Sequence, residues 1–279
     1  MKLSFIVLVT FVLWWHSVSA STPLLIKNVS VVNVEKSPII SKQDVLIENG
    51  LIAKLGKNLS MPYGQVIDGT NKYLTAGLID THTHLHGVPG MTHQQTMAFP
   101  DIAREAQEQI PKSYLYHGFT TVIDLNSNKN VIQHWNSQKI RPTAYFCGGA
   151  PYIDGYPMTF MPKPLRYQMM KYFLIGDNDA PEGVSKQDHT PKSVIKRMVK
   201  DGAICVKTHY EKGFGQDRNL PIPEAELIKE LRKEAHHAGI PILIHANYES
   251  AQQFAIEAEV DALAHGMWRW EQNSDLIEG

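Results

Sequence analysis

The chain has 279 residues, of which 43% are hydrophobic and 20% charged, a composition typical of a globular protein with one large or two small domains. Its 27 basic and 28 acidic residues leave a formal net charge of −1. This composition excludes extensive disorder. Without a basic surplus, no nucleic acid is expected as a partner.

The first twenty residues have the pattern of an export signal. Lys2 precedes an apolar stretch from Phe5 to Trp15, and small residues in cleavage-site spacing lead to Ala20. The stretch is shorter than the roughly 18 apolar residues that a membrane-spanning helix needs. We therefore expect residues 1–20 to be a signal peptide cleaved near Ala20, a periplasmic or secreted location and no stable membrane anchor.

The two cysteines of the chain, Cys147 and Cys205, lie in separate apolar, strand-like segments. Export favours disulfide formation. Two cysteines so far apart in the sequence are compatible with a disulfide, but their pattern does not indicate one.

The segment after the signal predicts a small β layer. Residues 24–34 and 44–56 are rich in β-branched side chains, and Asn49-Gly50 lies between two apolar runs. Because both central residues of a type I′ turn need a positive φ, this dipeptide predicts a tight β-hairpin.

From Thr75 onward, short apolar strands alternate with amphipathic helical runs, and Gly239 ends one of these runs. This repetition is typical of parallel βαβ units. The predicted strands are residues 77–84, 120–125, 143–149, 203–209, 241–247 and 261–266.

These βαβ units suit either a doubly wound sheet or a (β/α)8 TIM-type barrel. Histidines or a lysine end four of the strands, and barrel active sites are built where several strand ends converge, so we favour the barrel. The connection from Ala150 to about Pro191 is longer than the others. It follows the third strand, and we expect it to lie over the mouth of the barrel.

The strand-end residues predict a metal site. His82 and His84 alternate along the first strand, so both side chains point to one face, and the other candidates are Lys207, His245 and His265. Imidazole is the commonest zinc ligand, although each histidine alone would more often be structural. Their joint occurrence at the same end of successive strands favours metal binding.

Three further histidines are not expected to be ligands. His86 lies beyond the strand end, next to Gly87, and we expect it to support the ligands or the loop. His236 and His237 follow an amphipathic helix away from the mouth, where we expect them at the surface.

Lys207 has a special position among these groups. An ammonium near metal-binding imidazoles would be repelled by the ion, so this lysine must be neutral, displaced or chemically modified. Reaction with CO2 would make it an anionic carbamate able to bridge two metals. The alternative is a lysine that points to solvent.

The order of these motifs resembles the amidohydrolase superfamily, most closely its imidazolonepropionase-like and Xaa-Pro dipeptidase-like branch. The resemblance runs from about Leu24 to the last residue. It rests on the motifs "LTAGLIDTHTHLHG", "GFTTVIDL", "GAICVKTHYEKG", "AHHAGIPILIHAN" and "VDALAHG".

The resemblance implies an N-terminal β-sandwich portion over residues 21–75 and a metal-dependent (β/α) barrel over residues 76–279. It also implies one or two divalent metals, with two zinc ions expected if Lys207 is the carboxylated bridge. His82 and His84 would bind the more buried metal, and His245 and His265 the second.

We expect an incomplete barrel of about six units. Only 13 residues follow Gly266, and the 204 residues after Thr75 are fewer than the roughly 250 of a full barrel. The aspartate that the family carries on strand eight as general base and acid has no counterpart, so no catalytic residue is assigned. Open edge strands would favour aggregation or pairing with another chain, for example in a homo-oligomer.

Two functions remain open. The first is a hydrolase in which a metal-activated hydroxide attacks the carbonyl carbon of an amide, a cyclic amide or an Xaa-Pro dipeptide. The second is an inactive or non-catalytic metal-binding protein on the same scaffold. Substrate-binding residues are not assigned, and His209 and Tyr210 are left out of the site.

Overall fold

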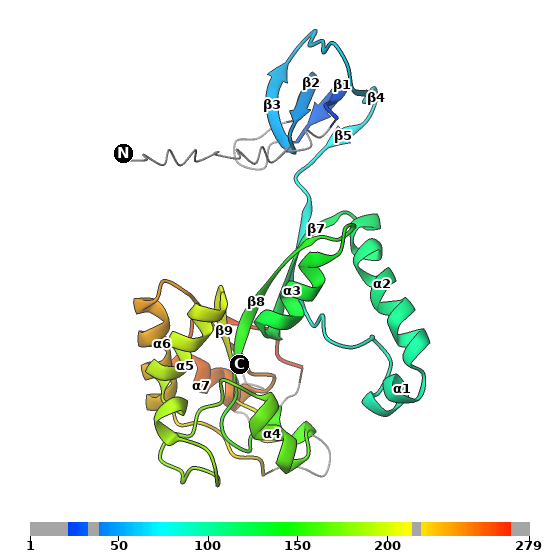
Figure 1. Ribbon diagram of the computed structural model, residues 1–279. Helices are drawn as coiled ribbons and strands as arrows, with labels where there is room; N and C mark the ends of the chain where they lie inside the picture. The colour runs from blue at the N-terminus through cyan, green and yellow to red at the C-terminus, as the bar shows by residue number, and fades with distance from the viewer. Residues whose placement is uncertain (1–21, 33–38, 214–218, 269–279) are drawn as a thin grey trace, which may run out of the picture. The chain divides into compact units, whose positions relative to one another are not determined.

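The computed structural model describes residues 22–32, 39–213 and 219–268 (Figure 1). The chain divides into two compact units, Met1–Ala76 and Gly77–Gly279. The predicted signal peptide lies outside the described residues. Within the described residues, no helix combines the length and the apolar character that crossing a membrane requires.

The described part of the N-terminal unit is a five-stranded sheet. β1 is antiparallel to β2 and parallel to both β4 and β5, and the order is β3-β2-β1-β4, with β5 beside the second half of β1. Its strands are β1 (Leu24–Val31), β2 (Ile40–Glu48), β3 (Leu51–Gly56), β4 (Gln65–Asp68) and β5 (Tyr73–Leu74).

The predicted hairpin joins β2 to β3. Asn49 and Gly50 have φ angles of 52° and 76°, the positive values that this turn requires. One buried carboxylate ties the sheet together, because Asp44 accepts hydrogen bonds from the backbone N–H groups of Asn28 (2.8 Å) and Leu59 (2.9 Å).

The second unit is a parallel α/β half-barrel, which confirms the predicted fold class. Each strand pairs in parallel with the next one along the chain, so the order in space is the order in sequence. The strands described here are β6 (Leu78–Thr83), β7 (Phe119–Ser127), β8 (Thr143–Ala150), β9 (Cys205–His209), β10 (Ile242–His245) and β11 (Ala262–Leu263).

Helices connect the strands of the half-barrel. In α5, Pro191 occupies the first turn, the Thr190 hydroxyl caps the helix by accepting from the N–H of Ser193, and Gly202 ends it at φ 89°. The helices are α1 (His93–Ala98), α2 (Pro100–Tyr116), α3 (Lys129–Ser137), α4 (Lys163–Met169), α5 (Pro191–Asp201), α6 (Ala225–His237) and α7 (Glu249–Glu257).

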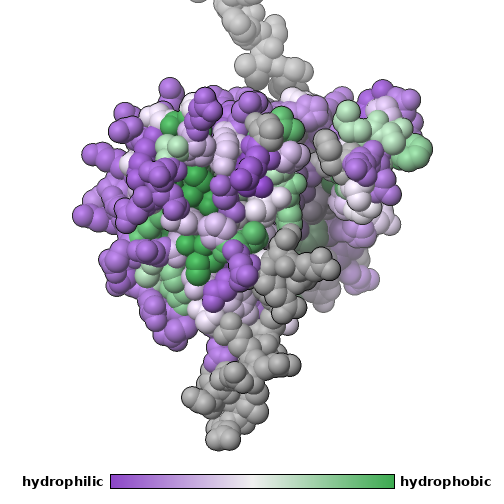
Figure 2. Space-filling model, turned by 90° about the horizontal axis from the view of Figure 1, so that it is seen from below, coloured by the Kyte–Doolittle hydropathy of each residue, from purple (hydrophilic) through white to green (hydrophobic). Residues whose placement is uncertain are grey.

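The main core lies between the sheet and these helices. Val206 of β9 and Ile244 of β10 are fully buried in one cluster with Met198 of α5, Leu231 of α6 and Ala251 of α7. Burial of these apolar side chains stabilises the half-barrel by removing their surface from water. The outer face seen from below is mostly hydrophilic, with smaller hydrophobic areas between the polar residues (Figure 2).

The long connection after β8 forms a small layer with its own core. It contains two 3-10 helices, η1 (Met158–Phe160) and η2 (Lys186–His189), as well as α4. Its core includes Met158 and Phe173, both fully buried. As predicted, it reaches the mouth of the half-barrel, since the ring of Tyr156 lies beside those of His209 (5.5 Å between centroids) and His245 (4.8 Å).

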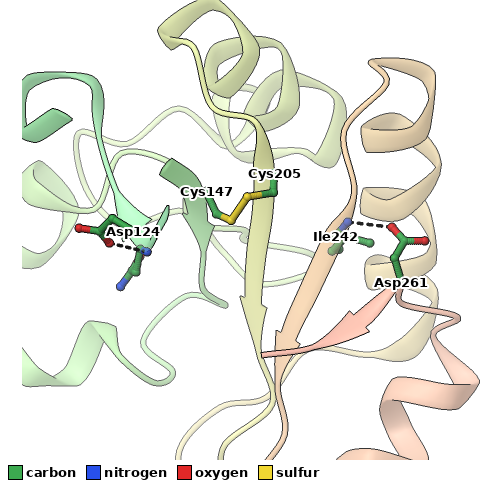
Figure 3. Close-up of a disulfide and its surroundings, with 6 residues drawn as sticks. Asp124, Cys147, Cys205, Ile242 and Asp261 are labelled. Atoms are coloured by element: carbon green, nitrogen blue, oxygen red, sulfur yellow. Dashed lines mark hydrogen bonds between the residues drawn. A yellow bond between two sulfur atoms is a disulfide. The ribbon is translucent and has the colours of Figure 1, made fainter. Parts of the chain in front are cut away.

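A disulfide joins the two cysteines. Cys147 on β8 and Cys205 on β9 are register partners in the sheet, and their sulfurs are bonded (Figure 3). Both are buried in a cluster with Leu125 of β7. The sequence pattern did not indicate this bond, because the register of β8 against β9 is what brings the two cysteines together.

Candidate metal centre

The first two predicted ligands come from the end of β6. His82 lies within the strand and His84 directly follows it, and their ring centroids are 5.5 Å apart. His82 Nδ1 is 2.8 Å from the carbonyl oxygen of Ala264, which follows β11. The first and last strands of the half-barrel therefore approach each other at their carboxyl ends, where the site lies.

The second pair of histidines comes from β10 and the segment after β11. His245 is buried, and its Nδ1 is 2.8 Å from Nε2 of His265. The ring of His265 stacks at 5.7 Å on that of His82. This contact connects the two histidine pairs that the sequence predicted.

Lys207 lies on β9 among these imidazoles. Lys207 is 3% exposed, so its side chain does not point to solvent. Burial lowers the pKa of Lys207 to about 8, although the nearby carboxylate of Asp124 acts in the opposite direction. The charge of Lys207 in turn contributes to the lowered pKa values of His82 and His265.

Three histidines of the site have lowered pKa values. Burial is the largest cause in each case: it lowers the pKa of His265 to about 4, lowers that of His82, and lowers that of His209 well below its usual value. Neutral imidazole has the free nitrogen lone pair that a metal ion requires. The buried Nδ1 atoms of His209 and His265 have no hydrogen-bond partner among the described residues. This set of donors fits a divalent metal of the zinc type.

Two buried carboxylates support the histidines. Asp124 on β7 lies 3.7 Å from Nδ1 of His84 and accepts hydrogen bonds from the backbone N–H groups of Leu85 (2.7 Å) and Asn126 (3.0 Å). Burial opposes its ionisation, but His84 and these N–H groups hold the pKa of Asp124 below its usual range. Glu211, after β9, lies 3.2 Å from Nε2 of His245.

His86, which we expected to support the ligands or the loop, lies beside the site. Its ring is 5.8 Å from that of His84. His84, His86 and Asp124 can each offer one donor atom, and these atoms lie within 4.8 Å of one another. His236, by contrast, is exposed on α6 and pairs with Asp261, at the surface as predicted.

Sequence reasoning missed three members of this cluster: Asp124, His209 and Glu211. His209 carried a usable signal, because Lys207 and His209 alternate on β9 as His82 and His84 do on β6. Asp124 is next to the last residue of the predicted strand 120–125, so its position near the mouth was also accessible. Glu211 lies in the loop after β9, where no periodic pattern indicates a side chain's direction.

Comparison with known proteins shows the family of this chain. The model of the amidohydrolase family matches residues 73–266. A dihydroorotase from Aquifex aeolicus is 30% identical over 243 residues, covering 86% of this chain and 46% of the relative. A dihydropyrimidinase from Dictyostelium discoideum is 48% identical over 62 residues, covering 22% of this chain and 12% of the relative.

Solved structures show the same fold. A prolidase complexed with N-methylphosphonate-L-proline has a TM-score of 0.65 at 18% identity, over 87% of this chain and 60% of its own. A Xaa-Pro dipeptidase with bound methionine has a TM-score of 0.60 at 20% identity, over 87% and 61%. The chain spans less than half the length of the two curated relatives and about three fifths of these structures. By the match of residues 73–266, the chain belongs to the amidohydrolase family.

Proposed function

We propose that this protein is a metal-dependent hydrolase that cleaves a carbon–nitrogen bond in a small amide, a cyclic amide or an Xaa-Pro dipeptide. The observation that carries the proposal is the buried amine of Lys207, which lies at the mouth of the half-barrel near His82 and His265, two histidines with lowered pKa values. The relatives named dihydroorotase and dihydropyrimidinase and the structures of a prolidase and a Xaa-Pro dipeptidase support this class of reaction.

The proposed ligands fall into two pairs around one bridge. His82 and His84 would hold one metal, His245 and His265 the other, and Lys207 would join them as a carbamate. In that modification the ammonium first loses one proton, the resulting neutral amine adds to the carbon of CO2, and the nitrogen then loses a second proton, so a buried cation becomes an anion with two donor oxygens. Two zinc ions bound there would supply Lewis acidity and lower the pKa of a water molecule.

The protein's own groups orient this donor set. Asp124 and Glu211 each contact one ring nitrogen, of His84 and His245 respectively, and so fix the orientation of these two rings. Tyr156, from the long connection, packs against His245. Groups that are oriented in advance in this way strengthen the electrostatic stabilisation of a hydrolytic transition state.

One observation favours a second candidate function, a non-catalytic protein that binds a single metal. His84, His86 and Asp124 alone can offer three donors within 4.8 Å of one another. A metal held by these three residues would not involve Lys207. The two functions therefore differ in how the metal content depends on the lysine.

Metal content per chain, measured by plasma mass spectrometry, tests the proposal. We expect two zinc ions in the wild type, fewer in Lys207→Ala, and two in the control Lys196→Ala, which changes an exposed lysine on α5. With 13C-labelled bicarbonate, a carbamate NMR signal should appear in the wild type and be missing in Lys207→Ala. One ion that is unaffected by Lys207→Ala would refute the bridged site and support the single-metal function.

A substrate screen separates catalysis from binding. We expect the metal-loaded chain to hydrolyse at least one of the three substrate classes, and His82→Ala/His84→Ala to lose both metal and hydrolysis. Two bound metals without hydrolysis of any amide, cyclic amide or Xaa-Pro dipeptide would contradict the catalytic proposal and favour a binding protein.

Export and self-association complete the proposal. The disulfide between Cys147 and Cys205 supports an oxidising, periplasmic or secreted location, since such bonds persist there. On the edge strand β6, Leu78 and Ile79 are 53% and 59% exposed, which supports pairing of this edge in a homo-oligomer. Fractionation of cells and light scattering of the purified protein would test these two points.

A further inference from the structure

A cavity of about 250 Å³ adjoins the candidate metal centre at the carboxyl ends of β7 and β8. Ser127, the last residue of β7, and Gly149 of β8 line it. His86 also lines it and lies ring to ring with His84, one of the proposed metal ligands. A molecule bound at the metal centre could therefore extend a substituent into this cavity.

Methionines provide much of its apolar wall. Met161, Met169 and Met170, all from the long connection, line it together with Val131 of α3. We call this cavity the methionine pocket. Methionine side chains are flexible and polarisable, so they adapt to apolar groups of different shapes. The volume is below the roughly 300–1,000 Å³ of pockets that enclose whole ligands, and suits one substituent.

Polar groups restrict what the pocket can accept. Ser127 is 8% exposed and its hydroxyl oxygen is buried. This hydroxyl has no hydrogen-bond partner among the described residues. A buried hydroxyl left unpaired costs free energy, so a ligand that supplies a partner is favoured. None of the lining residues is acidic, whereas Lys171 and His86 are basic. The lining therefore disfavours a cationic substituent.

We propose that the methionine pocket is a specificity subsite for an uncharged, apolar substituent of the amide substrate, with the buried Ser127 hydroxyl among its hydrogen-bonding groups. This inference rests on the proposed hydrolase function, because the metal centre would position the amide that carries the substituent. It selects amides with a side chain such as that of leucine or methionine over those with glycine or lysine.

Binding of dipeptides, measured by isothermal titration calorimetry, tests the subsite. We expect the chain to bind leucyl-proline about tenfold more tightly than glycyl-proline, because an apolar side chain leaves water, and to bind lysyl-proline no better than glycyl-proline. A second pair, glycyl-leucine and glycyl-glycine, places the apolar group on the amine side of the bond. If the preference for leucine occurs in just one of the two pairs, it identifies which side of the amide bond enters the pocket.

Two pairs of variants locate the preference. Val131→Phe fills the pocket and should abolish the preference for leucine, whereas Val199→Phe, at an exposed position of α5, should retain it. Met169→Ala removes part of the wall and should reduce the preference several-fold, whereas Met97→Ala on α1 should not. Met169 and Met97 are 58% and 70% exposed, so neither substitution threatens folding.

The outcomes separate the pocket from the metal centre. Metal content and dipeptide titrations are measured on the same samples, in metal-loaded and metal-free form. Two outcomes would overturn the subsite and leave the hydrolase proposal intact. The first is normal metal content without any preference for leucine in either form. The second is a preference for leucine that survives both Val131→Phe and Met169→Ala. A preference without metal retention would support the pocket and refute the hydrolase.

Discussion

Glu211 and His245 form a buried pair in which Oε2 of the carboxylate lies 3.2 Å from Nε2 of the imidazole. The side chains are 0% and 4% exposed. The same carboxylate accepts a hydrogen bond from the N–H of Gly213 at 2.9 Å, which ties the loop after β9 to the end of β10. This pairing leaves Nδ1 of His245 directed at His265.

Glu211→Gln should therefore weaken metal binding without displacing a ligand. A carboxylate behind a histidine ligand fixes its tautomer and raises its basicity, and its loss typically costs about 10–100-fold in metal affinity. Competition with a chromophoric chelator measures this affinity. Glu226→Gln, at an exposed position of α6, is the matched control and should leave it unchanged. Equal affinities for the two variants would mean that Glu211 serves the loop alone.

Asp124→Ala should lower the stability of the metal-free chain. The substitution leaves the backbone N–H groups of Leu85 and Asn126 without their acceptor, and a buried donor without a partner costs about 1–3 kcal/mol. Urea unfolding of the metal-free variant measures the change in the free energy of unfolding. Asp101→Ala, in the exposed first turn of α2, is the control and should change little. An unchanged urea midpoint for Asp124→Ala would show that water replaces the carboxylate.

His189, which lies outside the metal centre, should make the stability of the chain depend on pH. Its ring stacks on Phe173 at 3.7 Å, and its Nδ1 lies 2.8 Å from the Phe173 carbonyl. Burial lowers the pKa of His189, and the positive charge of Arg197 acts in the same direction, although the Phe173 carbonyl and Asp188 oppose them. The unfolded chain therefore binds a proton to this residue at a higher pH than the folded chain does.

The sign of the effect follows from this difference. Above the pKa of about 6.5 that histidine has in the unfolded chain, His189 is neutral in the folded and in the unfolded state. Its contribution to the free energy of unfolding is then fully present. As the pH falls below that value, the unfolded state gains protons first and stability is lost. We expect the melting temperature of the wild type to fall between pH 7 and 5 more steeply than that of His189→Gln. Parallel curves for the two proteins would contradict this assignment.

The disulfide should contribute substantially to stability. Cys147 and Cys205 are separated by 58 positions, and closing a loop of this length is worth about 4 kcal/mol in the chain-entropy model. Guanidinium unfolding of Cys147→Ala/Cys205→Ala should show a loss of this order, and dithiothreitol should destabilise the wild type but not the double variant. Equal stability of the oxidised wild type and the double variant would show that packing of the β8–β9 pair suffices.

Local patterns in the sequence were enough to predict the half-barrel. Each strand is a short apolar run bounded by turn residues or by a helix with its own period, and these patterns depend only on neighbours in the chain. The Asn49-Gly50 hairpin is equally local, because the two φ angles that it requires are properties of those two residues.

The composition of the site was only partly accessible from the sequence. The alternation of His82 and His84 along β6 is a property of one strand, and five strand-end residues could be named from such patterns. Glu211 and the disulfide depend instead on strand register, which pairs Cys147 with Cys205 and His209 with His245. Register is decided by the packing of the whole sheet.

Curvature of the sheet decided the rest. His82 and Ala264 are 182 positions apart, and they meet at 2.8 Å because the parallel strands curl until the first and the last approach each other. Strand twist and the packing of helices on one face produce that curl, and neither can be derived from a single segment. The type and order of the elements are therefore local properties of this chain, whereas the burial of Lys207 and the contacts of Asp124 are properties of the assembled half-barrel.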